Sequence, residues 1–176
     1  ADPGSVSWAG GSAGGADHIA VGLLANAAGV DPTAINYIAY SGGGEALAAI
    51  LGNQVTAGIS SVGEFKPQAD AGTLRILAVT SEERIEGIDA PTLSESGLDV
   101  VLQNWRMVAA APGLSAEDQA AIAADIETMA KSTAWQEALA SKGWSDTYLA
   151  GDEFNAQLEQ DIATTAAVLK DIGLVE

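Results

Sequence analysis

Residues 6–28, VSWAGGSAGGADHIAVGLLANAA, join a short apolar run to a helical pattern through a turn rich in glycine. We expect a strand at Val6–Ala9, because its Val and Trp favour extended chain. We expect a helix at Ala16–Ala28, because its apolar residues recur every three or four positions and Gly29 is suited to end it. A strand followed by glycines and a helix is the repeating unit of an α/β sheet, so this stretch indicates the fold class.

The same alternation of strand and helix continues through the first half of the chain. The patterns predict, in order, a strand at 35–40, a helix ending at Leu51, a strand at 55–59, a short helix to Ala71 and a strand at 76–79. This βαβαβαβ order predicts an α/β fold in which a parallel-type sheet is covered by helices on both faces. The near-continuous apolarity of the last run is typical of a strand that is buried on both faces.

The chain changes character at residues 81–103, where charged and turn-forming residues replace the apolar runs. We expect a connection with one short helix there, and a domain boundary that divides the chain into residues 1–103 and 104–176. The second part begins with an expected strand at 104–111. It continues with helices after the capping residue Ser115, at 133–142 and at 152–170. Because Trp105 directly follows the boundary, a role for it as a hinge or a cleft wall is open.

The composition excludes several classes of function. With 24 acidic and 7 basic residues the net charge is −17, which repels nucleic acid and anionic membrane surfaces. A hydrophobic content of 48% argues against disorder, and no run of about 18 apolar residues indicates a membrane span. One histidine and no cysteine supply no metal cluster, and the glycine-rich loops lack the nucleotide signatures, so we expect no metal and no cofactor.

Residues Gly10–Gly14 fit the G-x-S-x-G pattern of a serine hydrolase, with Ser12 as the candidate nucleophile. Such a serine needs a histidine base, which normally comes from a later part of the chain. The only histidine, His18, lies on the helix that follows the loop and rises away from it by about 1.5 Å per residue. We therefore expect no enzymatic activity and no catalytic residue, and a hydrolase that uses Ser12 is the enzymatic alternative.

Three loops follow the first three expected strands, and parallel strands bring their carboxyl ends to one edge of a sheet. Glycines let the backbone approach a ligand closely, and a helix that begins directly after them points its unpaired N–H groups at that ligand. The expected ligand-binding residues are Ser12, Ala13, Gly14, Gly15, Ser41, Gly42, Gly43, Gly44, Ser60 and Ser61. In the first loop we expect one ligand carboxylate to accept hydrogen bonds from the N–H groups of Ala13, Gly14 and Gly15 and from the Ser12 hydroxyl.

Several blocks of sequence together resemble one family. In chain order they are GGSAGGADHIAVGLLANAAGV, INYIAYSGGGEALAAILGNQVTAGIS, AGTLRILAVTSEER, APTLSESGLDV, NWRMVAAAPG and EFNAQLEQDIATTAAVLKDIGL. They resemble the substrate-binding proteins of tripartite tricarboxylate transporters, the TctC or Bug-type family. The resemblance covers almost the whole chain in the order of the family, although the GGG of the second loop departs from its commoner pattern.

The resemblance implies a periplasmic-binding-protein-like (type II) fold with two lobes that close on a small mono-, di- or tricarboxylate. It implies a protein that delivers this ligand to membrane permease subunits, and a periplasmic or extracellular, membrane-tethered location. Residues 1–103 then form the second, ligand-binding lobe, and residues 104–176 belong largely to a first lobe that is incomplete.

The opening residues show no export signal and run straight into the first strand, so we expect the N-terminal part of the family to be absent from this chain. Apolar faces after residue 104 are then uncovered, and self-association of the chain is expected. A ligand-sensing module that reports to a signalling partner is the alternative to transport. The sequence leaves open the identity of the carboxylate and its affinity.

Overall fold

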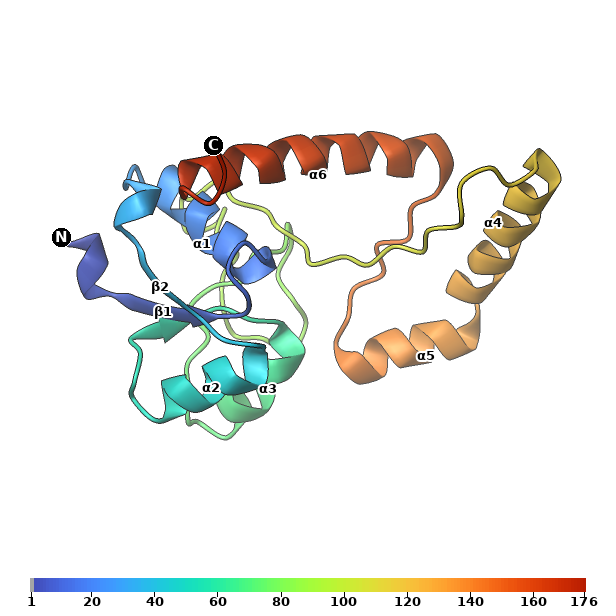
Figure 1. Ribbon diagram of the computed structural model, residues 1–176. Helices are drawn as coiled ribbons and strands as arrows, with labels where there is room; N and C mark the ends of the chain where they lie inside the picture. Colours follow the sequence, from blue (N-terminus) through green and yellow to red (C-terminus); the bar gives the residue numbers. More distant parts are fainter. Residues whose placement is uncertain (1) are drawn as a thin grey trace. The chain divides into compact units, whose positions relative to one another are not determined.

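In the computed structural model, which describes residues 2–176, a three-stranded parallel sheet organises the first half of the chain (Figure 1). Its strands, in spatial order, are β2 (Asn36–Ala39), β1 (Ser7–Gly10) and β3 (Ala57–Gly58). Ala9 of the central strand is fully buried and stands opposite Ile38 on one side and Gly58 on the other. The predicted parallel sheet is therefore present, with the first predicted strand at its centre.

Two helices connect these strands. Helix α1 (Ala16–Ala27) joins β1 to β2, and α2 (Gly43–Leu51) joins β2 to β3. Because β1 is central, the two connections run in opposite directions along the sheet, and right-handed connections then place the helices on opposite faces. Figure 1 shows α1 and α2 on the two sides of the strands. Helix α3 (Val62–Asp70) follows β3, and short 3₁₀ turns at Pro3–Ser5 and Pro32–Ala34 precede β1 and β2.

The core beside α2 is built from small side chains. The buried residues of this core are Ala9, Ala46, Ala49 and Val55, with Ile38, Tyr40 and Ile50 packed against them. Alanines on the helix let its backbone approach the strands closely. Each CH₂ group that is buried contributes about 0.8 kcal/mol to the stability of the fold. A Cβ atom on Gly58 would collide with the Ile50 side chain, so the glycine of β3 makes the room that this isoleucine fills.

The far end of the chain packs on the other side of α1. Helix α6 (Gly151–Asp171) ends beside it, and a Cβ atom on Gly22 would lie 2.7 Å from Cγ2 of Ile172 and 3.0 Å from Cγ1 of Val168. Asn26 Nδ2 also donates to Asp171 Oδ2 at 2.8 Å. Residues near the two ends of the sequence therefore form one packed layer.

The chain divides into two units. Unit 1 comprises the residues up to Asn104 together with Ile162–Glu176, and unit 2 comprises Trp105–Asp161. Unit 2 contains α4 (Ala116–Ala130), α5 (Thr133–Lys142) and the first part of α6. The cap predicted at the start of α4 is confirmed, because the Ser115 hydroxyl accepts from the Asp118 N–H at 3.1 Å. The assignment of residues 1–103 and 104–176 to two lobes stays a prediction.

Two predicted strands are wrong. At 76–79 the described chain has one isolated bridge, between Val79 and Thr92, instead of a ladder. The Val79 N–H donates to the carbonyl of Pro91, and because proline has no N–H of its own it limits further pairing there. Residues 104–111 belong to no strand, since no other strand pairs with them and a strand alone is not stable. The order in unit 1 is therefore βαβαβα followed by irregular chain.

The short helix expected within residues 81–103 is also absent from the described chain. A turn stands in its place, where the Ser96 N–H donates to the carbonyl of Leu93 at 3.0 Å and Gly97 has a φ of +84°. A glycine in this left-handed conformation stops the chain from continuing as a helix beyond a single turn. The other predicted helices are confirmed within one or two residues of their predicted ends.

Candidate functional site

The three loops that follow the strands lie at one edge of the sheet. The second and third loops meet directly, because a Cβ atom on Gly43 would collide with the Ser60 hydroxyl and the Glu64 carboxylate. The first and third loops follow neighbouring strands, and the Ile59 N–H donates to the carbonyl of Ala9 at 2.9 Å. The structure therefore brings the predicted loops together, as expected for parallel strands.

Side chains of α1 accept hydrogen bonds from the backbone of the first loop. Asp17 Oδ2 accepts from the Gly11 N–H at 2.7 Å, and His18 Nδ1 accepts from the Gly14 N–H at 3.2 Å. The Gly15 N–H donates to the carbonyl of Ser12 at 2.9 Å. Two of the three N–H donors that we expected in this loop, those of Gly14 and Gly15, are thus already used within the chain. This finding corrects the expected donor set. The donors that remain in the first loop are the hydroxyl of Ser12 and the N–H of Ala13, and both residues are exposed.

His18 supports the first loop. Its ring stacks on Tyr37, with centroids 4.1 Å apart and planes 5° from parallel. Tyr37 Oη in turn donates to the carbonyl of Gly11 at 2.8 Å. Burial lowers the pKa of His18, so the ring is neutral at pH 7, with Nδ1 as acceptor and the proton on Nε2. The Nδ1 atom of His18 is therefore engaged by the Gly14 N–H and its ring by Tyr37.

Partial burial sets the electrostatics of the first loop. Desolvation raises the pKa of the Asp17 carboxyl, the Gly11 N–H opposes this shift, and the nearby Glu64 adds to it. Desolvation also raises the pKa of the Tyr37 phenol, with a further contribution from the charge of Asp17. Tyr37 is therefore a permanent hydrogen-bond donor, whereas Asp17 takes up a proton more readily than an exposed aspartate does.

Each loop is followed by an acidic residue in the first turn of its helix. These residues are Asp17 in α1, Glu45 in α2 and Glu64 in α3. Glu45 Oε2 accepts from the Ser41 N–H at 3.1 Å, and Glu64 Oε2 accepts from the Ser61 hydroxyl at 3.1 Å and from the Ser60 hydroxyl. A carboxylate in this position interacts favourably with the positive end of the helix dipole.

The sequence analysis missed these three acidic residues, although their signal was present. The spacing of Ser61 and Glu64 is that of a capping box, and an acid two or three positions into a helix is a recognised start signal. They change what the site can do, because an anion that binds at these helix ends must lie beside the carboxylates or displace them. Gly43 is buried against the Glu64 side chain. Gly44 is exposed, and a Cβ atom added to it would have no other atom within 4 Å.

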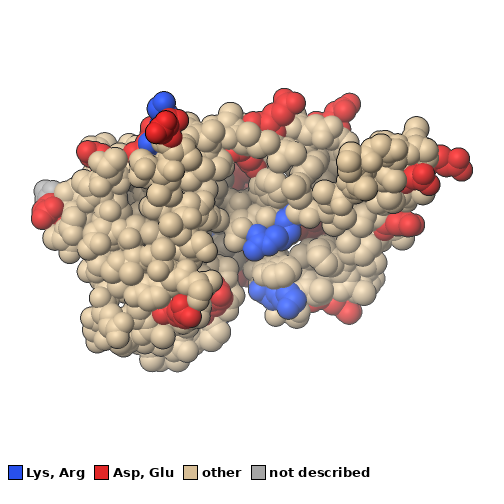
Figure 2. Space-filling model, viewed as in Figure 1, with Lys and Arg blue, Asp and Glu red and all other residues tan. Residues whose placement is uncertain are grey.

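Backbone N–H groups and serine hydroxyls such as that of Ser12 are the donors that these loops offer to an anion. In any α-helix the N–H groups of the first turn have no partner within the helix. None of the seven basic residues lies in the three loops. They are Lys66, Arg75, Arg84, Arg106, Lys131, Lys142 and Lys170. Figure 2 shows the acidic side chains of one face in small separate groups rather than in one patch. The edge therefore offers neutral dipoles rather than opposite charge.

Metal binding and membrane insertion find no support in residues 2–176. No group of three histidine, aspartate or glutamate side chains in this part of the chain is arranged to hold a metal ion. Within the same residues, no helix combines the length and the apolar character that a membrane span requires.

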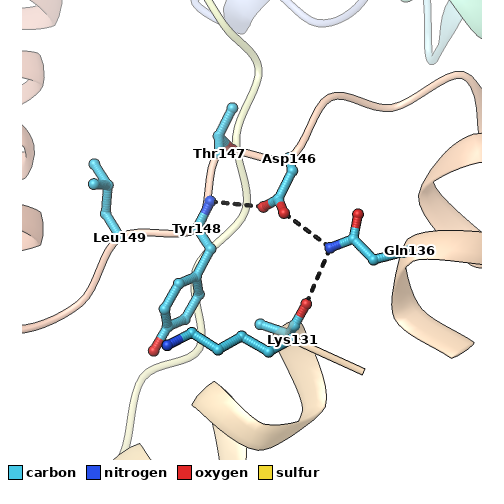
Figure 3. A pocket seen from close by; sticks show the side chains of 7 residues that line it. Lys131, Gln136, Asp146, Thr147, Tyr148 and Leu149 are labelled. Carbon is cyan, nitrogen blue, oxygen red and sulfur yellow. Dashed lines mark hydrogen bonds between the residues drawn. The ribbon is translucent and has the colours of Figure 1, made fainter. Parts of the chain in front are cut away.

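Unit 2 has a hollow of about 530 Å³ beside the ends of α4 and α5 (Figure 3). Its polar groups bind one another: Gln136 Nε2 donates to Asp146 Oδ2 at 2.9 Å, and Asp146 Oδ1 accepts from the Tyr148 N–H at 3.1 Å. Lys131 Nζ at its rim pairs with Glu127 Oε1. Because these groups have partners within the chain, the hollow is open surface between two helices and the following loop, and the predicted residues lie elsewhere.

Comparisons with known proteins agree on one family. Protein BugT of Bordetella pertussis is 29% identical over 175 residues, which cover 98% of this chain and 53% of that protein. A TctC solute-binding protein from Polaromonas, solved without ligand, matches with a TM-score of 0.77 and 26% identity over 94% of this chain and 57% of its own.

A second solved structure, the R. palustris protein Rpa4515 with adipate, has a TM-score of 0.78 at 23% identity and covers 96% of this chain and 56% of its own. The chain thus spans about half the length of these relatives, and the α/β fold expected from the resemblance is confirmed. The model of the tripartite tricarboxylate transporter family receptor matches residues 1–174. This chain therefore belongs to the TctC family of solute-binding receptors.

Proposed function

We propose that this chain forms part of an extracytoplasmic receptor that captures a small carboxylate for a tripartite tricarboxylate-type transporter, without chemical conversion. Membership of the TctC family supports a binding function, and a structural relative was solved with the dicarboxylate adipate. The observation that carries the proposal is the convergence of three loops, each leading into a helix, at the carboxyl edge of one parallel sheet.

The ligand carboxylate binds to backbone N–H groups at this edge. In this proposal the Ala13 N–H and the Ser12 hydroxyl of the first loop act with first-turn N–H groups of α1 and α2. Hydrogen bonds to a charged group contribute about 1.5–3 kcal/mol each. Four such bonds reach about −8 kcal/mol, which corresponds to a micromolar dissociation constant. The ligand-binding residues predicted in the second and third loops, from Ser41 to Gly44 and at Ser60 and Ser61, belong to the same proposal.

The acidic residues at the helix ends select among anions. Asp17 and Glu64 place negative charge next to the proposed ligand, so that a second ligand carboxylate is disfavoured unless it points away from them. A ligand whose two carboxylates are separated by an apolar chain meets this requirement, because only one end enters the edge.

The wider assembly is part of the proposal. Permease subunits as partners, a periplasmic or membrane-tethered location and the division into two lobes around residue 104 come from the family alone. Residues 107–111 lie in no helix or strand of the described chain, and we propose that they pair with a further part of the receptor. Where that part is absent, the same segment supports self-association.

Calorimetric titration with a panel of linear dicarboxylates tests the binding function. Ser12→Ala removes one charge-assisted donor and should weaken binding about tenfold, the equivalent of about 1.4 kcal/mol. Ser94→Ala is the matched control, because Ser94 is an exposed serine of unit 1 outside the three loops. Equal affinities for Ser12→Ala, Ser94→Ala and the unsubstituted chain would remove Ser12 from the site, and no heat with any dicarboxylate would contradict the proposed function.

A further inference from the structure

The exposed tip of the first loop, residues 12 and 13, lies between two peptide groups that side chains hold in place. Before the tip, Gly11 is bound by side chains at both its N–H and its carbonyl. After the tip, the Gly14 N–H donates to Nδ1 of His18 at 3.2 Å. The two donors proposed for the ligand in this loop therefore depend on the His18 bond for the position of one end of their segment.

The surroundings of Gly14 give its N–H little choice of acceptor. Gly14 has a φ of +76°, in the left-handed region that favours glycine. A Cβ atom added there would lie 3.4 Å from Cδ1 of Leu174 and 3.6 Å from Cδ2 of Leu169, so the end of α6 lies against this side of the loop. Leucine side chains accept no hydrogen bond. The imidazole of His18 is therefore the acceptor that fixes the Gly14 peptide.

The ring of His18 is itself held in one plane. It stacks on Tyr37, with centroids 4.1 Å apart and planes 5° from parallel, and the Tyr37 hydroxyl is bound to the carbonyl of Gly11 at 2.8 Å. A half-turn of the imidazole within that plane would keep the stack but would put a C–H group in the place of Nδ1. The bond to Gly14 thus needs the present orientation of the ring and an Nδ1 atom without a proton.

A proton on Nδ1 removes the acceptor, because a doubly protonated imidazole has donors only. Two N–H groups would then face each other across the 3.2 Å between His18 and Gly14. The tip of the loop is exposed, whereas the ring is half-buried and stacked, so the loop is the part that moves away. Burial lowers the pKa of His18 below its ordinary value of 6.5. The bond is therefore complete above pH 6.5 and is lost as the pH falls through the lowered pKa.

We propose that His18 and Tyr37 are positioning residues of the ligand site, and that protonation of His18 Nδ1 releases the first loop and weakens carboxylate binding in acid. The effect on binding rests on the function proposed above. The positive charge of the imidazolium acts in the opposite direction, because it attracts an anion. Loss of position outweighs this attraction, because water screens the charge of a partly exposed ring, whereas both ligand donors of the tip lose their fixed place together.

Other titratable groups near His18 leave the direction of this effect unchanged. A protonated Asp17 still has an oxygen that accepts from the Gly11 N–H, and the Tyr37 phenol stays protonated because burial raises its pKa. All of these groups are present in each variant below except where one is itself replaced, so a comparison between variants isolates His18. The charged and titratable groups of the surrounding elements are Asp17 on α1, Asp31 and Tyr37 before and on β2, Glu64 on α3, and Lys170 and Asp171 on α6.

Hydrogen exchange of the Gly14 amide, measured without a ligand, tests the release of the loop. We expect protection at pH 8 that falls about tenfold at pH 5, relative to the intrinsic exchange rate at each pH. The Ile59 N–H, which donates to the carbonyl of Ala9 in the sheet, is the internal control for general unfolding and should stay protected. Equal protection of Gly14 at both pH values would overturn the release, and this measurement needs no variant that has to fold.

Calorimetric titration with adipate at pH 5 and pH 8 tests the effect on binding. His18→Asn keeps an acceptor oxygen near the place of Nδ1 and has no proton to gain, so its change in affinity reports only the groups other than His18. The unsubstituted chain should lose about tenfold more affinity in acid than this variant, the equivalent of about 1.4 kcal/mol. An equal loss of affinity in both chains would overturn the proposal.

Tyr37→Phe keeps the stacked ring and removes the hydroxyl that binds Gly11. It should weaken adipate binding about fivefold at both pH values and leave the ratio between them unchanged. Tyr148→Phe, which removes a tyrosine hydroxyl in unit 2, is the matched control and should leave both affinities unchanged. Equal effects of the two substitutions would remove Tyr37 from the positioning of the loop.

The two measurements fail independently. Loss of Gly14 protection in acid, with no heat from adipate at either pH, would support the release of the loop and contradict the carboxylate function. Binding of adipate with unchanged Gly14 protection would support the carboxylate function and overturn the release.

Discussion

Units 1 and 2 differ in how much of their apolar surface they bury by themselves. In unit 1 the sheet and α2 enclose a core around Ala9 and Ala46, both 0% exposed, and α1 packs against the end of α6. In the described residues of unit 2, the buried hydrophobic residues are Ala130 and Leu139, while Met107 and Trp144 are each 54% exposed. Unit 1 therefore encloses a core of its own, whereas unit 2 leaves large apolar side chains exposed.

The same contrast applies to the loops. The loop after β1 is fixed by bonds from Asp17, His18 and Tyr37, so its backbone is set before any ligand arrives. In residues 105–111, which lie in no helix or strand, the Trp105 indole donates to Asp161 Oδ2 at 2.6 Å. A preorganised loop loses less conformational freedom on binding, which favours the first loop as the ligand contact.

The largest effect should come from overfilling the layer between α1 and α6. Gly22→Leu places a side chain where Ile172 and Val168 already stand, and overpacking of this kind costs about 1–3 kcal/mol. Urea unfolding followed by circular dichroism measures this loss. Ala27→Leu, on an exposed position of the same helix, should leave stability nearly unchanged, and equal losses in both variants would contradict the packing of α6 on α1.

A smaller effect, and one that depends on pH, should follow Asp17→Asn. The folded pKa of Asp17 lies above its ordinary value of 3.8, so its stabilising contribution is complete below that pH and is lost as the pH rises through the folded pKa. An asparagine keeps an acceptor for the Gly11 N–H and carries no charge. The variant should be more stable than the unsubstituted chain at pH 7, and the difference should shrink as the pH falls towards 4.

Thermal unfolding of both chains between pH 4 and pH 8 measures this difference. Asp31→Asn is the control with the opposite sign, because hydrogen bonds from Thr33 hold the pKa of Asp31 below its ordinary value. Its carboxylate therefore stabilises the chain at neutral pH, and the asparagine variant should be the less stable one there. A stability gain for Asp17→Asn that is the same at every pH would disprove the desolvation of Asp17.

The smallest effect on stability should come from unit 2. Val108→Lys alters an extended residue that is 67% exposed, and substitutions at such sites change the free energy of unfolding by about 0.5 kcal/mol or less. Its effect should appear in association instead, since the added charge reduces self-association through the exposed apolar side chains of Met107 and Val108. Sedimentation velocity over a range of concentrations would show this, and a stability loss as large as that of Gly22→Leu would place Val108 in a core.

Local signals explain what could be predicted from the sequence. The strands at β1 and β2, the helices after them and the cap at Ser115 depend on neighbouring residues, and these predictions are confirmed. The predicted strands at 76–79 and 104–111 depend on a partner strand, which local patterns cannot supply. The glycine loops could be placed at one edge of the sheet by the same local signals. The partners of two N–H groups could not be predicted: Gly14 donates to the His18 side chain on α1, and Gly15 donates to the carbonyl of Ser12.

The central claim is that a carboxylate binds to backbone N–H groups at the carboxyl edge of the sheet in unit 1. Titration of the ¹⁵N-labelled chain with adipate, followed by ¹H–¹⁵N spectra, tests it at each residue. The account predicts that the largest shifts fall on residues 11–17, 41–45 and 60–64, while the hollow around Lys131 and Tyr148 in unit 2 is unaffected. Shifts centred on that hollow, or an unchanged spectrum at millimolar adipate, would contradict it.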